Sequence, residues 1–231
     1  MTTIIHLEGL VGVGKSTLLR ALAADGYAVV HEDVPSWRDC GGVNLLHHFY
    51  KEPARYGRLF QQLTLHTQVR GVMRALRTRP PVLFVERSLR SNRVFACMLR
   101  NIIPAEDVGV YDAAWEAAAA CMEVVPGVRA LHVMLEADPQ VCAARVAERA
   151  SAAADGEDAI DVGYLQELQT AHEGAFANCG LLRLETDGRS VDDVKAELLQ
   201  FTAKERCSQL PRRQVSEYGQ GVCPVIHHQT Q

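Results

Sequence analysis

A glycine-rich segment near the start of the chain carries the clearest chemical signal. Residues 9–16 fit the pattern G-x-x-x-x-G-K-[ST] between an apolar run and a helical segment. Glycines let backbone N–H groups turn toward phosphate oxygens, and the helix start adds partial positive charge. We expect Lys15 to reach the β- and γ-phosphates of ATP and Ser16 to bind Mg²⁺. The predicted phosphate site comprises Gly9, Leu10, Val11, Gly12, Val13, Gly14, Lys15, Ser16 and Thr17.

Charged side chains follow two further apolar runs. Glu32 and Asp33 come after the second run, and Glu86 and Arg87 end the third. A carboxylate beside the phosphate loop could take a proton from an attacking hydroxyl group, and another could orient Mg²⁺. Arg87 could stabilise charge on a transferred phosphoryl group. Helix caps or a salt bridge would use the same residue types, so position alone leaves both interpretations open.

Aromatic and amide side chains occur together in the segment between the second and third runs. Phe49, Tyr50, Phe60 and Gln61 combine stacking surfaces with a group that can both donate and accept hydrogen bonds. A nucleobase needs both kinds of contact. Aromatic residues at helical spacing also form ordinary protein core, so this signal depends on its neighbours.

An arginine pair precedes a polar loop late in the chain. Arg145 and Arg149 are four residues apart, so they share a face of the predicted helix, which leads into residues 151–161. Such a pair suits a lid that closes over phosphates. A solvated helix face would show the same pattern.

Alternating strands and helices must position these groups. We predict strands at residues 3–7, 27–31, 82–85, 130–135 and 181–184. Helices are expected at residues 15–24, 55–77, 89–100, 106–124, 139–153, 164–177 and 191–204. This alternation predicts an α/β fold in which helices cover both faces of a five-stranded parallel sheet. Ligands of such sheets bind at the carboxyl ends of the strands, where the charged residues lie.

Composition narrows the class of protein. The 231 residues, 48% of them hydrophobic, suffice for one α/β domain, which we place at residues 1–206, with a flexible tail at 207–231. The net charge of −4 argues against a general nucleic-acid binder. The start shows no signal or transit pattern, and no apolar run is long enough for a membrane span. We therefore expect a cytoplasmic protein without a membrane partner.

These motifs, in this order, resemble the deoxyribonucleoside kinase family. The similar stretches are residues 5–16, 32–50, 60–61, 86–93, 145 and 164–168. Residues 37–51 are especially similar to the insect multisubstrate enzyme of that family, which also includes mitochondrial thymidine kinase and the deoxycytidine and deoxyguanosine kinases. The resemblance implies a P-loop kinase fold with an arginine-bearing lid. It also implies transfer of phosphate from ATP, with Mg²⁺, to the 5′-hydroxyl group of a deoxyribonucleoside, in a homodimer formed through residues 44–68.

The resemblance further implies roles for individual residues. Glu32 would be the general base, Arg87 would hold the 5′-hydroxyl group and the phosphates, and Lys15 would complete the catalytic set. Ser16 and Glu86 would organise Mg²⁺. Arg145 and Arg149 would be lid arginines on ATP. The implied substrate site comprises Glu32, Trp37, Leu46, Tyr50, Phe60, Gln61, Arg87, Phe95 and Glu157, in which Tyr50 and Glu157 hold the sugar 3′-hydroxyl group.

The sequence departs from the family where the base would bind. Relatives that prefer purines or cytosine carry Arg and Asp at the positions that align with Gln68 and Asn92, and relatives that prefer pyrimidines have small or apolar residues there. Thr64 adds a further polar group. An amide can serve several base edges, so we predict a pyrimidine-preferring enzyme, for thymidine or deoxycytidine, or a broad one.

Two alternatives remain at this point. A thymidylate-type nucleoside monophosphate kinase shares the phosphate loop, although it usually has Asp-Arg where this chain has Glu86-Arg87. A non-catalytic nucleotide-binding regulatory module would keep the loop but would not need Glu32, Arg87 and a lid together.

Overall fold

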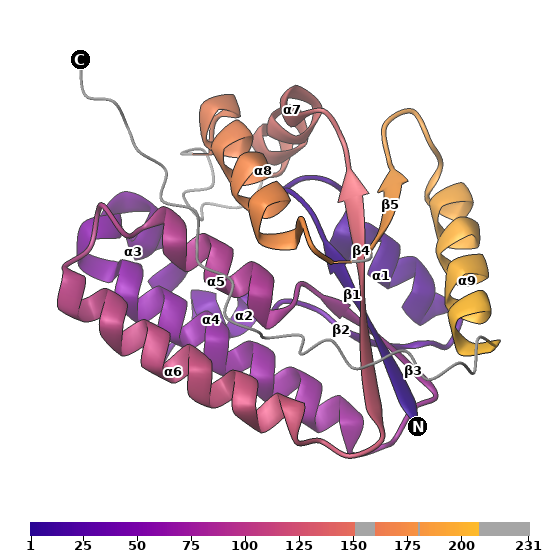
Figure 1. Cartoon of the computed structure of the whole chain (residues 1–231). Helices are drawn as coiled ribbons and strands as arrows, with labels where there is room; N and C mark the ends of the chain where they lie inside the picture. Colours follow the sequence, from indigo (N-terminus) through magenta and orange to yellow (C-terminus); the bar gives the residue numbers. More distant parts are fainter. Residues whose placement is uncertain (151–159, 180, 208–231) are drawn as a thin grey trace.

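The computed structural model describes residues 1–150, 160–179 and 181–207. These residues form an α/β fold around a parallel sheet whose strand order is β2-β3-β1-β4-β5 (Figure 1). The strands are β1 (Thr2–Glu8), β2 (Ala28–Val30), β3 (Val82–Glu86), β4 (Val128–Glu136) and β5 (Leu182–Glu185). The helices are α1 (Lys15–Ala24), α2 (Val34–Arg38), α3 (Leu45–Lys51), α4 (Pro53–Leu76), α5 (Leu89–Met98), α6 (Ala105–Glu123), α7 (Pro139–Ala150), α8 (Val162–Phe176) and α9 (Val191–Cys207). The predicted five-stranded parallel sheet is confirmed.

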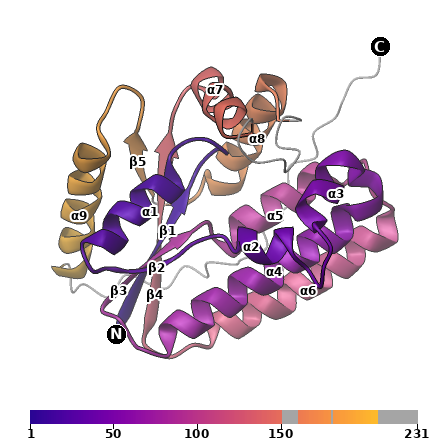
Figure 2. The ribbon, with the colours of Figure 1, turned by 180° about the vertical axis from the view of Figure 1, so that it is seen from behind.

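Helices cover both faces of the sheet because its central strands are apolar on both sides. Successive side chains of a strand point to opposite faces. Ile5 and Phe84 pack into the large core that includes α1 and α9, whereas Ile4 and Leu83 pack against Val72 of α4. Figures 1 and 2 show α1 and α9 on one side of the sheet and α4 and α6 on the other. The prediction of a doubly covered sheet is therefore correct.

The order of the strands places the functional loops together. β1 lies between β3 and β4, with Leu7 opposite Glu86 on one side and opposite Val133 on the other. The chain reverses its direction across the sheet at this strand, and such a point is where ligands bind in α/β sheets. The glycine-rich loop after β1 consequently lies beside the residues that end β3.

Two short helices lie where the sequence pattern predicted no helix. α2 begins after Asp33, whose side chain accepts a hydrogen bond from Ser36 N, and it contains Pro35 in its first turn. α3 begins after Asn44, whose side chain accepts from His47 N. Caps of this kind start helices that are too short to show a hydrophobic period. The residues that follow the charged pair Glu32 and Asp33 are thus a helix, α2.

Some sequence predictions concern residues outside the described part of the chain. Glu157 and most of the expected lid loop fall in residues 151–159, and the expected tail falls largely in residues 208–231. The boundary proposed at residue 206 stays a prediction. None of the helices in the described ranges is both long and apolar enough to cross a membrane.

Candidate active site

A cavity of about 650 Å³ opens at the carboxyl ends of the strands. The predicted site residues that line it come from the phosphate loop, the ends of β2 and β3, and helices α2 to α5 and α7. They are Val11, Gly12, Val13, Gly14, Lys15, Ser16, Thr17, Glu32, Trp37, Leu46, Tyr50, Phe60, Gln61, Thr64, Gln68, Glu86, Arg87, Asn92, Phe95, Arg145 and Arg149. Gly9 and Leu10 are not among the lining residues, but their carbonyl oxygens accept hydrogen bonds from Lys15 Nζ. The structure therefore brings together nearly all the residues singled out in the sequence.

The phosphate loop requires glycine at two close approaches. Gly9 and Gly12 have φ angles of 127° and 86°. A Cβ atom at Gly9 would lie 2.4 Å from the carbonyl oxygen of Leu135, and one at Gly12 would lie 2.5 Å from that of Cys142. A side chain at either place would push the loop away from β4 or α7. The first glycine of the pattern G-x-x-x-x-G-K-[ST] is thus needed by the fold itself, and Gly12, which the pattern does not specify, is needed for the same reason.

Lys15 is buried at the base of this loop. Its Nζ atom donates to the carbonyl oxygens of Gly9 at 3.2 Å and Leu10 at 2.7 Å. Burial, with repulsion from the Arg87 guanidinium, lowers the pKa of Lys15 to about 8. An ammonium group held this way has no carboxylate bonded to it among the described residues, so it is available to an incoming phosphate.

Glu86, at the end of β3, accepts hydrogen bonds from two other residues of the site. Ser16 Oγ donates to Glu86 Oε1 at 2.7 Å, and the Glu32 backbone N–H donates to Oε2 at 3.4 Å. Burial works to raise the pKa of Glu86, but the His31 ring, the Lys15 ammonium and the Ser16 hydroxyl together lower it to about 2. The carboxylate therefore stays ionised at neutral pH.

The oxygen atoms of Ser16 and Glu86 suit Mg²⁺ that is bound together with substrate phosphates. Mg²⁺ prefers oxygen ligands and is commonly held by one or two carboxylates together with substrate phosphates. Ser16 Oγ and Glu86 Oε1 supply adjacent hard oxygens at the helix start. Within the described residues, no cluster of three or more His, Cys, Asp or Glu side chains is placed to hold a metal ion on its own. Magnesium brought in with a nucleotide suits the site better than a resident ion.

Arg87 links the phosphate loop to Glu32. Its Nη1 donates to the Gly9 carbonyl at 2.9 Å and its Nε donates to Glu32 Oε1 at 2.8 Å. The guanidinium also lies 4.5 Å from the centre of the Phe95 ring. Burial, with the nearby Glu86 carboxylate, raises the pKa of Glu32, although Arg87 opposes the shift. Because the Glu32 side chain is still 29% exposed, its carboxylate can reach a ligand in the cavity.

The backbone of Arg87 is held from behind the site. Arg87 has a φ of 61°, in the left-handed region that non-glycine residues rarely adopt. Its N–H donates to Leu7 O at 2.9 Å, and its carbonyl oxygen lies 3.0 Å from His6 Nδ1, which must therefore carry the donating proton. The His6 ring stacks on His132, whose Nδ1 contacts Glu8 Oε1 at 3.0 Å. Buried side chains of β1 and β4 thus hold the backbone turn at Arg87, which sets the direction of its guanidinium group.

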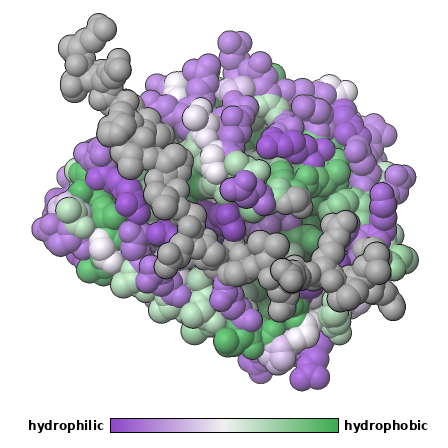
Figure 3. Space-filling model, in the orientation of Figure 1, coloured by the Kyte–Doolittle hydropathy of each residue, from purple (hydrophilic) through white to green (hydrophobic). Residues whose placement is uncertain are grey.

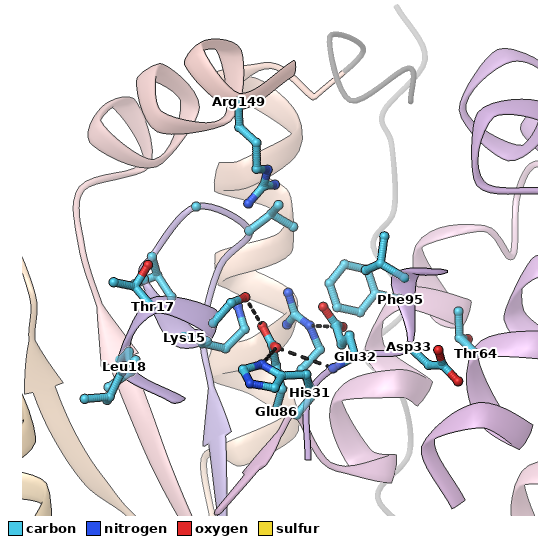
Figure 4. A pocket seen from close by; sticks show the side chains of 18 of the residues that line it. Lys15, Thr17, Leu18, His31, Glu32, Asp33, Thr64, Glu86, Phe95 and Arg149 are labelled. Atoms are coloured by element: carbon cyan, nitrogen blue, oxygen red, sulfur yellow. Dashed lines mark hydrogen bonds and ion pairs between the residues drawn. The ribbon is translucent and has the colours of Figure 1, made fainter. Parts of the chain in front are cut away.

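The adjacent residues Glu32 and Asp33 have different partners. Both line the cavity, but Glu32 pairs with Arg87, whereas Asp33 caps α2 and pairs with Arg70 of α4 at 2.6 Å. Figure 4 shows Glu32 near Glu86 and Asp33 turned toward the helices on the other side of the pocket. Asp33 thus makes the cap and ion-pair contacts that the sequence left open, whereas a chemical role for Glu32 stays a prediction.

The far end of the cavity is aromatic and neutral. Trp37 packs edge-on to Phe60 with ring centres 5.5 Å apart, and Phe60 stacks on Phe49 at 4.5 Å. Trp37 Nε1 donates to Thr67 Oγ1 at 3.0 Å, which anchors α2 on α4. Such a wall offers flat apolar surface to a planar ring without exposing an unpaired indole N–H.

Three helices share a hydrogen-bond chain at this end. Tyr111 OH of α6 donates to Asn92 Oδ1 of α5 at 2.5 Å, and Asn92 Nδ2 donates to Thr64 Oγ1 of α4 at 3.0 Å. Thr64 Oγ1 donates in turn to the Gln61 carbonyl oxygen at 2.9 Å. The Gln61 side chain is buried in the cavity wall, and no described residue forms a hydrogen bond with its amide.

The arginines of α7 lie above the phosphate loop. Arg145 Nη1 is 3.4 Å from Gly12 O, and Nη2 is 3.6 Å from Asp187 Oδ1 in the loop after β5. Arg149 extends from α7 toward the pocket in Figure 4. Their placement fits the predicted lid face, whose role stays a prediction.

Sequence reasoning missed several residues of the cavity wall. His31, Tyr164 and Thr186 line it, and Thr186 Oγ1 contacts Val13 O at 3.1 Å. His31 and Thr186 follow strands β2 and β5, so the rule that strand ends carry ligand contacts could have found them. Tyr111 lies outside the cavity lining, in an alanine-rich helix, and no sequence signal pointed to it.

Comparisons with known proteins agree with this geometry. The family model described as deoxynucleoside kinase matches residues 5–207. A probable deoxycytidine kinase of fowlpox virus is 29% identical over 200 residues, which cover 82% of this chain and 81% of that protein. A thymidine kinase of ictalurid herpesvirus 1 is 27% identical over 204 residues, covering 86% and 85%. Human mitochondrial thymidine kinase 2 is 30% identical over 180 residues, covering 74% and 63%.

Proposed function

The chain belongs to the deoxynucleoside kinase family, and we propose that it transfers the γ-phosphate of ATP to the 5′-hydroxyl group of a pyrimidine deoxyribonucleoside. One observation carries the proposal. Glu32, bonded to Arg87, lies in a single cavity between the phosphate loop and the aromatic wall. A base at the aromatic end would therefore place its sugar near a carboxylate, and the ATP phosphates near Lys15.

The proposed reaction uses these groups for positioning and charge. Glu32 accepts the proton of the 5′-hydroxyl group while that oxygen attacks the γ-phosphorus, and the bond to the β-phosphate oxygen breaks to release ADP. Its raised pKa makes Glu32 a better proton acceptor than an ordinary carboxylate. Lys15, Arg87 and the lid arginines Arg145 and Arg149 stabilise the negative charge that spreads over the phosphoryl oxygens.

Substrate contacts follow from the remaining wall residues. Trp37, Leu46, Phe60 and Phe95 would enclose the base, and Gln61 would bind its edge. Tyr50, which lines the same cavity, would hold the 3′-hydroxyl group together with Glu157. Glu157 lies outside the described residues.

Ser16 and Glu86 would hold Mg²⁺ that arrives with ATP. Magnesium would supply positive charge against the β- and γ-phosphates. Glu86 is prepared for this because its pKa near 2 keeps it ionised, and the Ser16 hydroxyl already lies against it.

A homodimer is also part of the proposal. Leu59 of α4 is 47% exposed and Val110 of α6 is 51% exposed, which leaves apolar side chains uncovered on the helices outside the sheet. In Figure 3 apolar residues lie among hydrophilic ones on the left, over the region of α3 and α6. Exposed apolar side chains on these helices favour association through the segment 44–68. Light scattering of the full chain distinguishes a dimer from a monomer.

A phosphate-transfer assay tests the activity. ATP with Mg²⁺ is offered with thymidine, deoxycytidine, deoxyadenosine and deoxyguanosine, and separately with thymidine monophosphate. We expect turnover of a pyrimidine nucleoside and none of the monophosphate. Turnover of the monophosphate alone would identify a thymidylate-type kinase, and ATP binding without transfer to any acceptor would identify a non-catalytic module.

A further inference from the structure

The loop after β5 is bonded to the phosphate loop and to the end of β4. Thr186 Oγ1 lies 3.1 Å from Val13 O in the phosphate loop and 3.1 Å from Glu136 O, the last residue of β4. The Thr186 N–H also donates to Glu136 O at 2.8 Å. The phosphate loop, β4 and the loop after β5 are therefore held together at Thr186, directly before Asp187.

One carboxylate oxygen of Asp187 is fixed by the turn that precedes α7. Asp187 Oδ2 accepts a hydrogen bond from the Asp138 N–H at 2.6 Å. Asp138 is itself tied to the start of α7, since its side chain accepts from Gln140 N at 2.7 Å and its carbonyl oxygen accepts from Cys142 N at 3.0 Å. The backbone at the start of α7 thus orients the Asp187 carboxylate.

The second oxygen of this carboxylate faces Arg145, in the same helix. Asp187 Oδ1 is buried, forms no hydrogen bond with a described residue, and lies 3.6 Å from Arg145 Nη2. Arg145 Nη1 donates to Gly12 O of the phosphate loop at 3.4 Å. A strong hydrogen bond between a guanidinium and a carboxylate would be shorter, at about 2.7–2.9 Å. The guanidinium of Arg145 therefore lies between Asp187 and the phosphate loop without being tightly bonded to either.

This ion pair affects position more than stability. The side chains of Arg145 and Asp187 are 40% and 32% exposed, and ion pairs in contact with water add little to the free energy of unfolding. The contacts with Asp187 and Gly12 also leave most N–H donors of the guanidinium unused. Fixing a long side chain during binding costs conformational entropy, and a restraint already present in the free protein removes part of that cost.

We propose that Asp187 is a positioning residue that holds Arg145 over the phosphate loop, where its guanidinium binds the phosphate groups of the nucleotide. Arg145 and Gly12 both line the cavity. Asp187 is not among the described residues that line it, so Asp187 acts through Arg145 and not on the ligand. The inference rests on the proposed binding of ATP at the phosphate loop.

Asp187→Asn separates this role from the support that Asp187 gives to the turn before α7. The amide oxygen can still accept from Asp138 N, whereas the NH₂ group then faces Arg145, donor against donor. We expect the dissociation constant of ATP with Mg²⁺ to rise about fivefold and kcat to fall about tenfold. Calorimetry on the full chain without a nucleoside measures the first, and steady-state kinetics measures the second.

Asp25→Asn is the matched control. It removes the charge of an aspartate that pairs with Lys195 at 2.8 Å, and neither of these residues is among those that line the cavity. Both the ATP dissociation constant and kcat should stay unchanged in this variant. Thermal unfolding of every variant identifies any that fails to fold.

A second background tests whether Asp187 acts through Arg145. In an Arg145→Met protein, the further change Asp187→Asn should alter the ATP dissociation constant and kcat by less than about twofold, because the group that Asp187 positions is already absent. A general role of Asp187 in the structure of the loop would instead lower both quantities by the same factor with or without Arg145. Arg145 is exposed, so its replacement is expected to leave the fold intact.

Each outcome points to one conclusion. Loss of affinity or of kcat that is confined to the background with Arg145 supports the inference. No change in either quantity in Asp187→Asn, or equal loss in both backgrounds, contradicts it and leaves the kinase activity standing. Loss of ATP affinity that depends on Arg145, in a protein that phosphorylates no nucleoside, supports the inference and contradicts the proposed kinase activity. Failure of the folded natural protein to bind ATP contradicts both.

Discussion

Under the proposed function, the two ends of the cavity would recognise their ligands by different means. The phosphate end uses backbone N–H groups, one buried lysine and charged strand ends, all held by the sheet and a single loop. The base end uses neutral side chains of α2, α4, α5 and α6, joined by side-chain hydrogen bonds. Phosphate recognition would therefore be tied to the fold, whereas base recognition would depend on contacts between helices and could change through single side chains.

Removing the charge at the phosphate end should have the largest effect. We expect Lys15→Met to lower kcat/KM by about 10³-fold, because the buried ammonium is lost where charge develops on the phosphates. Steady-state kinetics with ATP measures it. Lys204→Met, at an exposed lysine on α9, is the matched control and should retain full activity. If Lys15→Met kept kcat/KM within tenfold of the natural value, the proposed role of the phosphate loop in the reaction would be wrong.

Replacement of Glu32 should have the next largest effect on activity. Replacement by Gln keeps the shape and the contact with Arg87 but removes the proton acceptor, so kcat should fall by about 10²–10⁴-fold with little change in KM for the nucleoside. Glu116→Gln, on the exposed surface of α6, controls for the change of charge. Near-normal turnover in Glu32→Gln would show that another group accepts the proton.

The phosphate end should also show an alkaline limit. The pKa of Lys15 is lowered to about 8, so the free enzyme loses this positive charge as pH rises through that value. We expect kcat/KM for ATP to fall up to about tenfold per pH unit above pH 8. Bound phosphates stabilise the ammonium, so kcat at saturating ATP should stay level to higher pH. A profile of kcat/KM that is flat from pH 7 to 10 would contradict the assignment.

Loss of the His6 contact that holds the Arg87 backbone should lower kcat less than loss of the charge of Lys15 or Glu32. His6→Phe keeps a ring beside His132 but loses the N–H that holds the Arg87 carbonyl, so kcat should fall about tenfold while KM for ATP changes little. His6→Asn places an N–H near the same position and should recover most of the loss. An equal fall in kcat in both variants would show that His6 acts through packing and not through its hydrogen bond to the Arg87 backbone.

The contrast between the two ends also explains what the sequence could predict. The phosphate loop is contiguous, and the strand-end residues Glu32, Glu86 and Arg87 follow from the position of the strands, so the cavity contains them as expected. The α/β fold followed from the alternation of apolar and helical segments. At the base end, α2 and α3 are five and seven residues long, too short for a hydrophobic period to show.

Contacts between helices are the part that sequence patterns could not supply. Asn92 and Thr64 were singled out as pocket residues, but the direction of the Asn92 amide depends on Tyr111, 19 residues away in another helix. The position of Tyr111 in α6 carries no motif, and its contact exists only because α5 and α6 pack together. Side-chain hydrogen bonds of this kind depend on the crossing of two helices, which periodicity within each one does not determine.

The smallest effect should come from the wall of the base end. Thr67→Val keeps the shape of Thr67 but removes the acceptor of Trp37 Nε1, leaving a buried indole N–H without a partner. The free energy of unfolding should fall by about 1–3 kcal/mol, and KM for the nucleoside should rise a few-fold with kcat unchanged, because the Trp37 ring loses its anchor. Chemical denaturation and kinetics measure the two effects. Thr78→Val, at an exposed threonine whose hydroxyl bonds only Ala75 O among the described residues, should change neither. A fall in kcat for Thr67→Val as large as that for His6→Phe would mean that the base end, too, positions the reacting groups, and the separation between the two ends would not hold.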